Sequence, residues 1–415
     1  MKKSGELEKA SVHWHAVAMQ TSSEPMDTSK QFCPNTACCA RGQTGEGNIT
    51  IHDRKRHRYR CKVCKQTFSE RRGTMFEGLR KPMELIVIVL TLLSYGCPVQ
   101  AIVQAFGLDE RTVASWRDRA GAHCEQVHQA LVEAGRLDLV HVQADEIRVK
   151  GRNMIAWMGL AMMVSTRLWL AGTVSLTRDK GLADTLMHQV RRSAQTLRPL
   201  LVLTDGWAAY PGSIRRAFRE KVKKLAGVGR ASLEVWPHLH IGTVIKRTEK
   251  KRVVEITRKM AHGLSDQAEQ LLQLSGGGNV LNTAFIERLN GTIRERLASL
   301  NRKCRHSASR LRALLTGMYL IGCTYNFCVA HQELSKHAGY PCTPAMAAGL
   351  TDHIWSLWEL MSYRVAPAPW VEPKKRGRSK KQAASLTGRA TYKGVRSRPR
   401  PLLRLRKGVL CSTTG

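Results

Sequence analysis

The sequence predicts an α/β protein in which a helix-covered sheet follows a small cysteine-rich module and an all-helical module. Four aliphatic residues, 200–203, have the pattern of a strand buried on both faces, and they end at Asp205 and a glycine. Two cysteine pairs fall within residues 33–64, and residues 82–120 show helical spacing with glycine and proline at the boundaries. A chain of 415 residues is long enough for two or three such domains.

The charge of the chain predicts a polyanionic partner. Lys and Arg number 67 against 32 acidic residues, a formal net charge of +35, and nucleic acid is the usual partner of such a surplus. A membrane surface is the competing polyanion, but the longest aliphatic run, residues 85–93, is too short to span a bilayer. Residues 1–30 are polar, without the apolar core of a secretory signal, so we expect a flexible leader in a cytoplasmic protein.

Residues 31–72 are predicted to form a zinc ribbon, because two cysteine pairs on tight turns are separated by a hairpin-length connection. The four thiolates expected to bind Zn²⁺ are those of Cys33, Cys38, Cys61 and Cys64. The adjacent Cys39 leaves the second ligand open, and Cys38 is preferred because of the preceding Pro-Asn turn. His52 and His57 are spare candidates.

The connection between the cysteine pairs is dense in positive charge. Residues 54–60 read Arg-Lys-Arg-His-Arg-Tyr-Arg, which is either a solvated loop or a phosphate-contacting segment. Beside a zinc ribbon we expect DNA contacts from Arg58 and Arg60.

Residues 80–135 are predicted to form a helix-turn-helix domain. Helices are expected over 83–94, after a proline, over 98–106, and from 110 to 119 after the capping residue Asp109. A short helix, a glycine turn and a polar helix match the layout whose last helix enters a major groove, although a plain three-helix packing unit has the same pattern. In the DNA-binding interpretation, the contacts come from Arg111, Thr112 and Arg117.

From residue 137 the pattern changes to strands, and residues 137–362 are predicted to form one domain. Strands over 139–144, 154–164 and 167–176, a helix over 180–196 and the strand ending at Asp205 are the order in which a ribonuclease H-like sheet begins. The first and fourth strands of that fold are neighbours, which would bring Asp145, at the predicted end of the first strand, close to Asp205. A fifth strand is expected over 241–246, a helix over 248–275 and a break at the glycines 276–278.

The helix predicted over 282–300 carries a third acid. Its apolar face is formed by Leu289, Ile293, Leu297 and Leu300. Glu287, Asn290 and Arg294 fall on another face, so the acid can face a metal and the arginine a phosphate, unless this face is simply solvated. Asp145, Asp205 and Glu287 are hard oxygen ligands of the kind that Mg²⁺ prefers, although an Asp-Gly after a strand is more often only a turn.

These motifs together resemble insertion-sequence-one-type DDE transposases, over about residues 31–362. The resemblance is carried by Ala144-Asp145-Glu146, residues 204–210 and 282–290, Arg294 and Arg296-Leu297, with residues 59–61 and 67–69 upstream and residues 325–328 and 343–351 downstream. It implies a ribonuclease H-like catalytic domain in which Asp145, Asp205 and Glu287 bind Mg²⁺ or Mn²⁺, with Glu146 as a neighbour rather than a ligand. It also implies a nucleoid-associated homodimer or higher assembly on double-stranded DNA, at transposon ends and target, with contacts from Lys246, Arg247, Asn290 and Arg294.

The expected chemistry uses two metal ions about 3.5–4 Å apart, first to hydrolyse a transposon end and then to direct its 3′-hydroxyl onto target DNA. No covalent protein intermediate is needed. The alternatives are a DNA-binding regulator with an inactive sheet, against which the presence of all three acids argues, and a structure-specific nuclease that cuts without joining.

Residues 363–415 lie outside the resemblance. This tail is strongly basic, and residues 374–381 are similar to a minor-groove hook but lack its usual proline. Because it is too polar to bury a core, we expect it to be disordered until it meets DNA.

Overall fold

The structure, a computed structural model, describes residues 26–223, 231–250, 252–300 and 310–372. Its first element is a three-stranded antiparallel sheet of β1 (Ile49–Asp53), β2 (Arg58–Cys61) and β3 (Thr67–Ser69). Tyr59 of β2 is fully buried and stacks on Phe68 of β3 with ring centroids 6.0 Å apart. This small sheet lies within the segment predicted as a ribbon.

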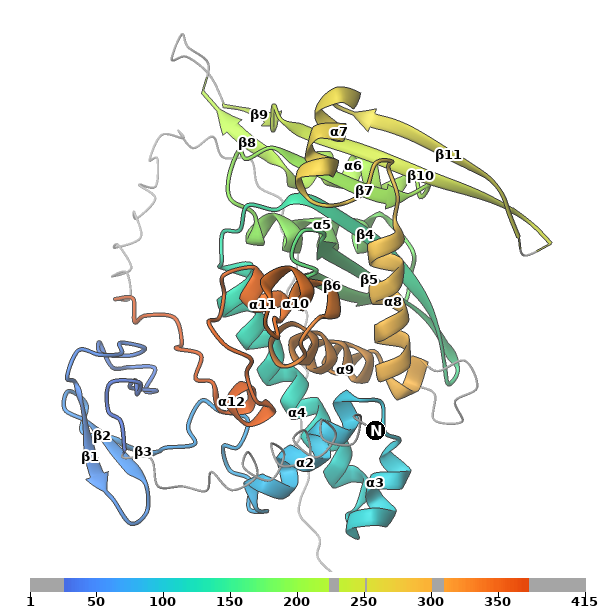
Figure 1. Ribbon diagram of the computed structural model, residues 1–415. Helices are drawn as coiled ribbons and strands as arrows, with labels where there is room; N and C mark the ends of the chain where they lie inside the picture. The colour runs from blue at the N-terminus through green and yellow to red at the C-terminus, as the bar shows by residue number, and fades with distance from the viewer. Residues whose placement is uncertain (1–25, 224–230, 251, 301–309, 373–415) are drawn as a thin grey trace, which may run out of the picture. The chain divides into compact units, whose positions relative to one another are not determined.

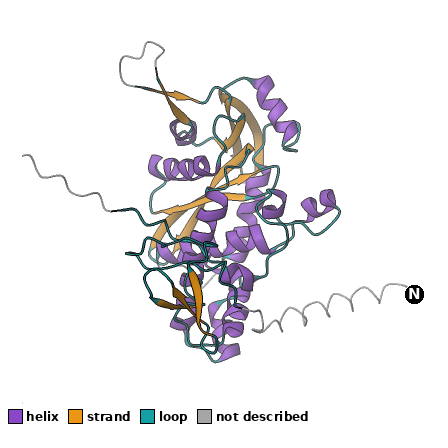
Figure 2. Ribbon diagram, turned by 90° about the vertical axis from the view of Figure 1, so that its left-hand side faces the viewer, coloured by secondary structure: helices purple, strands orange, loops and turns teal. Residues whose placement is uncertain are grey.

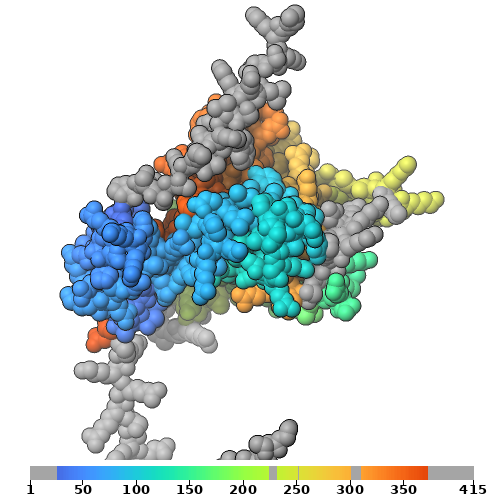
Figure 3. All heavy atoms as spheres, turned by 90° about the horizontal axis from the view of Figure 1, so that it is seen from below, coloured from blue at the N-terminus to red at the C-terminus, as the bar shows by residue number. Residues whose placement is uncertain are grey.

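Three helices follow, close to the predicted positions: α2 (Met83–Ser94), α3 (Val99–Phe106) and α4 (Glu110–His128). The side chain of Asp109 accepts a hydrogen bond from the Thr112 amide and caps α4, while Gly107 ends α3 in the left-handed conformation, at φ 58°. Within α3 the buried residue is Ile102, and the helix lies at the surface (Figure 3).

Helix α4 is longer than predicted and continues through the π-helical turn Gln129–Glu133. It packs against α9 (Leu311–Cys323) so closely that a Cβ on Gly121 would lie 2.1 Å from the Thr316 carbonyl oxygen. The apolar residues of α2, α3 and α4 therefore belong to the same core as those of the large sheet.

The large sheet has six strands in the order β11-β10-β7-β4-β5-β6 (Figure 1). These strands are β4 (Val140–Gly151), β5 (Met154–Met163), β6 (Trp169–Ser175), β7 (Leu200–Asp205), β10 (Leu239–Glu249) and β11 (Arg252–His262). Strands β4, β7 and β10 are parallel, while β5, β6 and β11 pair antiparallel to their neighbours. The prediction that the first and fourth strands are neighbours is confirmed, since Ala144 pairs with Thr204.

Helices cover both faces of this sheet (Figure 2). Helices α5 (Lys180–Ser193) and α6 (Ala209–Ala217) pack on each other, and α5 packs on β5 and β6. On the other face, α7 (Ser265–Leu274) and α8 (Ala284–Arg296) contact β4. Alternation along β7 separates the faces: Leu201 and Leu203 pack on α7, so Leu200 and Val202 point the other way. A short hairpin, β8 (Arg219–Val222) with β9 (Ser232–Val235), follows α6.

Two sequence predictions about this sheet are wrong. Strand β4 does not end at Asp145 but runs on to Gly151; what ends there is its pairing with β7. Residues 248–275 are not one helix, because β11 precedes α7. Strands β10 and β11 form a long hairpin at the sheet edge (Figure 1), and β11 is exposed along most of its length, so it lacks the apolar pattern of a buried strand.

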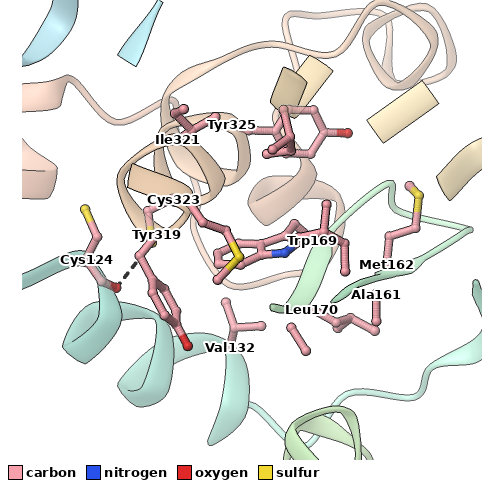
Figure 4. Packing of buried hydrophobic residues seen from close by; sticks show 14 of the residues in the cluster. Cys124, Val132, Ala161, Met162, Trp169, Leu170, Tyr319, Ile321, Cys323 and Tyr325 are labelled. Atoms are coloured by element: carbon pink, nitrogen blue, oxygen red, sulfur yellow. Dashed lines mark hydrogen bonds between the residues drawn. The ribbon is translucent and has the colours of Figure 1, made fainter. Parts of the chain in front are cut away.

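The core between α4 and α9 is built around Trp169 (Figure 4). Its ring lies 4.5 Å from that of His128 and 5.4 Å from that of Tyr319, measured between centroids. The segment Leu311–Ala338 is long and apolar enough to cross a membrane, but 72% of its most apolar window is buried inside the protein. It includes α10 (Gln332–Ala338), and it has the burial of a core helix.

The chain beyond α11 (Pro344–Ala347) and α12 (Leu357–Ser362) still contacts the rest of the protein. Arg364 donates a hydrogen bond of 2.9 Å to the Glu70 carbonyl, and Tyr363 stacks on Trp355. The predicted tail therefore does not begin as a free segment at residue 363. Its basic part, including the predicted hook at 374–381, lies outside the described residues.

Candidate active site and metal centres

Three carboxylates meet where the parallel pairing of β4 and β7 ends. Asp145, Glu146 and Asp205 each offer an oxygen, and the three atoms lie within 4.8 Å of one another. Asp145 and Glu146 are consecutive in β4 and point to opposite sheet faces. Asp205 is the last residue of β7, so it lies beside both of them. The sequence analysis predicts that Glu146 is a neighbour of the site and not a ligand, whereas the structure includes its carboxylate in the group.

Asp145 faces α8. Its Oδ2 accepts a hydrogen bond of 2.8 Å from the Asn290 side-chain amide, and its Oδ1 accepts one of 2.8 Å from the Glu146 backbone amide. Burial raises the pKa of Asp145 to about 6; the Glu146 amide opposes this shift, and the negative charges of Asp205 and Glu287 add to it. The nearby positive charge of Arg294 lowers the pKa by less than burial raises it, so a bound cation would further stabilise the ionised carboxylate.

Glu146 points to the opposite face and is nearly inaccessible, with 3% of its side chain exposed. It pairs with Arg178 and accepts a hydrogen bond of 3.0 Å from the Tyr210 hydroxyl. Burial and then the charge of Asp205 raise its pKa. Asp205 is more exposed, and it accepts a hydrogen bond of 3.1 Å from the Trp207 amide, which fixes its carboxylate at the turn after β7.

Glu287 is placed differently from the two aspartates. It is not in the group of three carboxylates, and 46% of its side chain is exposed. It pairs with Lys246 and accepts a hydrogen bond of 2.7 Å from the Thr283 hydroxyl. With Asp205 and Arg178 it lines a cavity of about 490 Å³. Of the three predicted acids, Asp145 and Asp205 are in the group of carboxylates, and Glu287 lines the same cavity as Asp205.

Gln143, which the sequence interpretation does not single out, holds α8 in place. Its Oε1 accepts hydrogen bonds from the backbone amides of Phe285 and Ile286, at 3.1 and 3.0 Å, and its Nε2 donates to the Asn282 carbonyl at 2.8 Å. Thr283, at the N-cap position, makes no capping bond, so Gln143 satisfies the free amides of the first turn. The available signal in the sequence was an amide side chain between the apolar residues Val142 and Ala144, and the structure buries it fully.

The donor set at this site fits a divalent cation. Three clustered carboxylates, two of them with raised pKa values, are hard oxygen ligands that repel one another unless positive charge is added. The buried Oδ1 of Asn290 has no hydrogen-bond partner within the described part of the chain. An acidic group of this composition can bind Mg²⁺ or Mn²⁺.

The four cysteines predicted as zinc ligands lie together, and one of them, Cys61, is the last residue of β2. Sγ atoms of Cys33, Cys38, Cys61 and Cys64 all lie within 4.8 Å of one another. The separations are 3.6 Å for Cys33 and Cys64 and 4.0 Å for Cys38 and Cys61. Tetrahedral zinc with bonds of about 2.3 Å places its sulfurs about 3.8 Å apart, so the group can bind Zn²⁺. Cys39 is exposed and outside the group.

The arginines of the ribbon that are predicted to contact DNA are near the surface. Arg58 donates a hydrogen bond of 2.6 Å to the Thr67 hydroxyl, and Arg60 donates one of 3.3 Å to the Lys65 carbonyl. His57, a spare zinc candidate, instead pairs with Glu70 at 2.9 Å.

On α4, the residues predicted to contact DNA differ in accessibility. Arg111 is exposed in the first turn, whereas Thr112 is half-buried and its amide is used by the cap. Arg117 pairs with Asp118 at 2.8 Å, and 23% of its side chain is exposed.

The remaining predicted DNA contacts lie on β10 and α8. Lys246 pairs with Glu287, and Arg247 pairs with Glu249 at 2.7 Å. Arg294 is half-buried, and its charge lowers the pKa of Asp145. Asn290 is 2% exposed and its amide is used by Asp145, so the structure places it inside the site rather than on a DNA-facing surface.

Comparisons with known proteins leave the family open. No family model matches the sequence, and no curated protein matches it. Among solved structures, the chain is similar to a piggyBac transposase in a synaptic complex with hairpin DNA, at 10% sequence identity and a TM-score of 0.33. The match covers 71% of this chain and 76% of that one.

Proposed function

We propose that the chain is a DDE transposase of the insertion-sequence-one type, with a ribonuclease H-like catalytic domain. One observation carries the proposal: Asp145 and Asp205 lie on neighbouring parallel strands with their carboxylates in one cluster, and Glu287 borders the same cavity. The adjacency of the first and fourth strands supports the fold, because that pairing is what the ribonuclease H-like order requires.

Asp145, Asp205 and Glu287 would hold the metal ions, with Glu146 as a further oxygen donor beside them. Bound Mg²⁺ ions supply charge that stabilises the attacking and leaving oxygens of an in-line displacement at phosphorus. Gln143 and Asn290 position this set by fixing α8 against β4. No covalent intermediate between protein and DNA is needed, because water or a DNA 3′-hydroxyl is the nucleophile.

Double-stranded DNA is the proposed partner, both as transposon end and as target. The formal charge of +35 supports binding to phosphates, which is non-specific by itself. Specific recognition is assigned to the zinc ribbon and to the exposed first turn of α4, with Arg58, Arg60 and Arg111 as the contacts. A dimer or higher assembly on DNA, in a cytoplasmic and nucleoid-associated location, completes the proposal.

The test is a cleavage and strand-transfer assay with the terminal inverted repeats expected for its element, a plasmid target and Mg²⁺ or Mn²⁺. We expect cut ends joined to the target, lost in Asp205→Ala and retained in Glu295→Ala, which removes an exposed acid of the same helix. Cutting without joining would favour a structure-specific nuclease. Sequence-specific binding with no cutting would favour a regulator.

A further inference from the structure

Two basic side chains lie inside the acidic site. Arg178, in the segment between β6 and α5, contacts both Glu146 and Asp205, with Nε 2.5 Å from Glu146 Oε1 and Nη2 3.4 Å from Asp205 Oδ2. Lys246, on β10, contacts Glu287. Both side chains line the cavity of about 490 Å³.

Arg178 is held in this position by more than charge. Its guanidinium carbon lies 4.6 Å from the ring centroid of Trp207 and 5.2 Å from that of Trp157. A cation over the face of an aromatic ring is stabilised by the ring quadrupole, and arginine stacks in this way better than lysine. Two carboxylates and two indoles therefore form a site for one guanidinium.

Lys246 makes the matching contact on the other face of the sheet. Even-numbered residues of β10 point to the face covered by α7 and α8, because a Cβ on Gly242 would point at Leu203 and Leu281 there. Lys246 therefore faces Glu287 of α8. Of the four acids of the site, Glu146, Asp205 and Glu287 thus have an internal cation. Asp145, with its hydrogen bond from Asn290, has none at hydrogen-bond distance among the described residues.

We propose that Arg178 and Lys246 are internal counter-ions of the active site, which compete with divalent cations for the carboxylates of Glu146, Asp205 and Glu287. This inference rests on the proposed metal site. When a cation takes these oxygens, the guanidinium and the ammonium lose their partners and become free for the nearest other anion, a DNA phosphate. Both residues are thus positioning residues that couple metal binding to DNA binding.

The first experiment measures Mn²⁺ binding to the full chain by isothermal titration calorimetry, without DNA and at low salt. Arg178→Gln and Lys246→Gln should each tighten Mn²⁺ binding about fivefold, the size expected when one partly exposed competing ion pair is removed. The control is Arg198→Gln, which breaks an ion pair of 2.6 Å with Asp138 outside the cavity and should leave the affinity unchanged. Arg178→Lys, which keeps the charge, should stay near wild type.

The outcomes separate the two proposals. If Asp205→Ala abolishes Mn²⁺ binding while both glutamine variants bind Mn²⁺ as wild type or more weakly, the counter-ion role is wrong and the metal site stands; Arg178 would then merely hold the carboxylates in place. If Asp205→Ala binds Mn²⁺ as wild type does, or wild type binds none, the metal site fails and this inference with it. Circular dichroism checks that each variant is folded, and Lys246, being at the surface, tests the idea even if Arg178→Gln unfolds.

Discussion

The Oε1 atom of Gln143 accepts a hydrogen bond of 3.0 Å from the backbone amide of Ile286, so a strand side chain caps the helix that carries Glu287. Gln143 lies two residues before Asp145 and on the same face of β4. One short stretch of strand therefore supplies a carboxylate to the cluster and also sets where the helical acid stands.

Replacing Gln143 by Leu should destabilise the protein by about 1–3 kcal/mol, because two amides of the first turn of α8 would remain buried without an acceptor. Cleavage of DNA ends should also fall, since Glu287 would lose its fixed position, while DNA affinity should hold. Urea unfolding measures the stability, a cleavage assay measures the loss of activity, and a binding assay checks that the affinity for DNA is unchanged. Gln273→Leu, at an exposed position of α7, is the matched control, with a change below about 0.5 kcal/mol. Equal losses in the two variants would argue against the capping role.

The raised pKa of Asp145 makes stability depend on pH. The folded pKa of about 6 exceeds the ordinary 3.8, so the native state holds this proton more tightly; that contribution is complete below pH 3.8 and is lost as pH rises through 6. In EDTA, the stability of Asp145→Asn relative to wild type should therefore rise by about 1–1.5 kcal/mol between pH 5 and pH 8, because this window contains about half of the full effect of the shift.

Thermal melts of Asp145→Asn and wild type at the two pH values measure this difference. Gln273→Leu is a suitable control, because it changes no titratable group and lies at an exposed position of α7, so its offset from wild type should be similar at both pH values. A difference for Asp145→Asn that shrinks towards pH 8 would contradict the raised pKa.

Alanine at Asp145, Asp205 or Glu287 should reduce both end cleavage and joining to below about 1% of wild type, because both steps use the same metal ions. DNA binding should remain near wild type or become slightly tighter, since negative charge is removed. Asp205→Cys should regain partial activity with Mn²⁺ but not with Mg²⁺, as expected for a softer ligand.

Isosteric substitutions to glutamine distinguish the roles of Glu146 and Glu287, and Glu295→Ala serves as the control. We expect Glu287→Gln to lose activity and Glu295→Ala to keep it. Glu146→Gln retains the shape of a buried side chain and should lower Mn²⁺ affinity. An active Glu287→Gln together with an inactive Glu146→Gln would identify Glu146 as the essential acid.

Cys61→Ser should lose the zinc that we expect at about one ion per chain, measured by mass spectrometry of the purified protein. It should also weaken binding to the inverted repeats while the large sheet stays folded. Cys39→Ser is the control, because this exposed neighbour of Cys38 lies outside the group of four. Full zinc content in Cys61→Ser would exclude the assignment.

The buried parts of the fold were the most predictable from sequence. Strand β7 was predicted to the residue, because a strand buried on both faces leaves a continuous aliphatic run that stops at a polar residue. Strand β11 was not predictable, because its residues are mostly exposed and show no apolar pattern. It is held in the sheet by backbone pairing with β10, which does not depend on the side chains.

The site was predictable only where its residues depend on the position and order of the strands. Asp205 follows from a strand end and Asp145 from the strand order, although β4 continues beyond Asp145. Glu146 does not follow from either, because alternation along β4 points it away from Asp145. It joins the group since Asp205 lies at the end of β7, where one carboxylate can lie near both faces. Gln143 depends on a contact across 143 positions with Ile286, which no local pattern contains.

Helix α4 begins at the surface with Arg111 and ends in the core, where His128 lies against Trp169. Its 19 residues form a rod of about 28 Å, at 1.5 Å per residue, with no break along it. A continuous helix of this kind fixes the distance between its first turn and the core at its other end. In the proposed complex, a DNA duplex bound at the first turn of α4 would lie at a fixed distance from the large sheet. The length of α4 would then set how far the cleaved bond lies from the recognised bases.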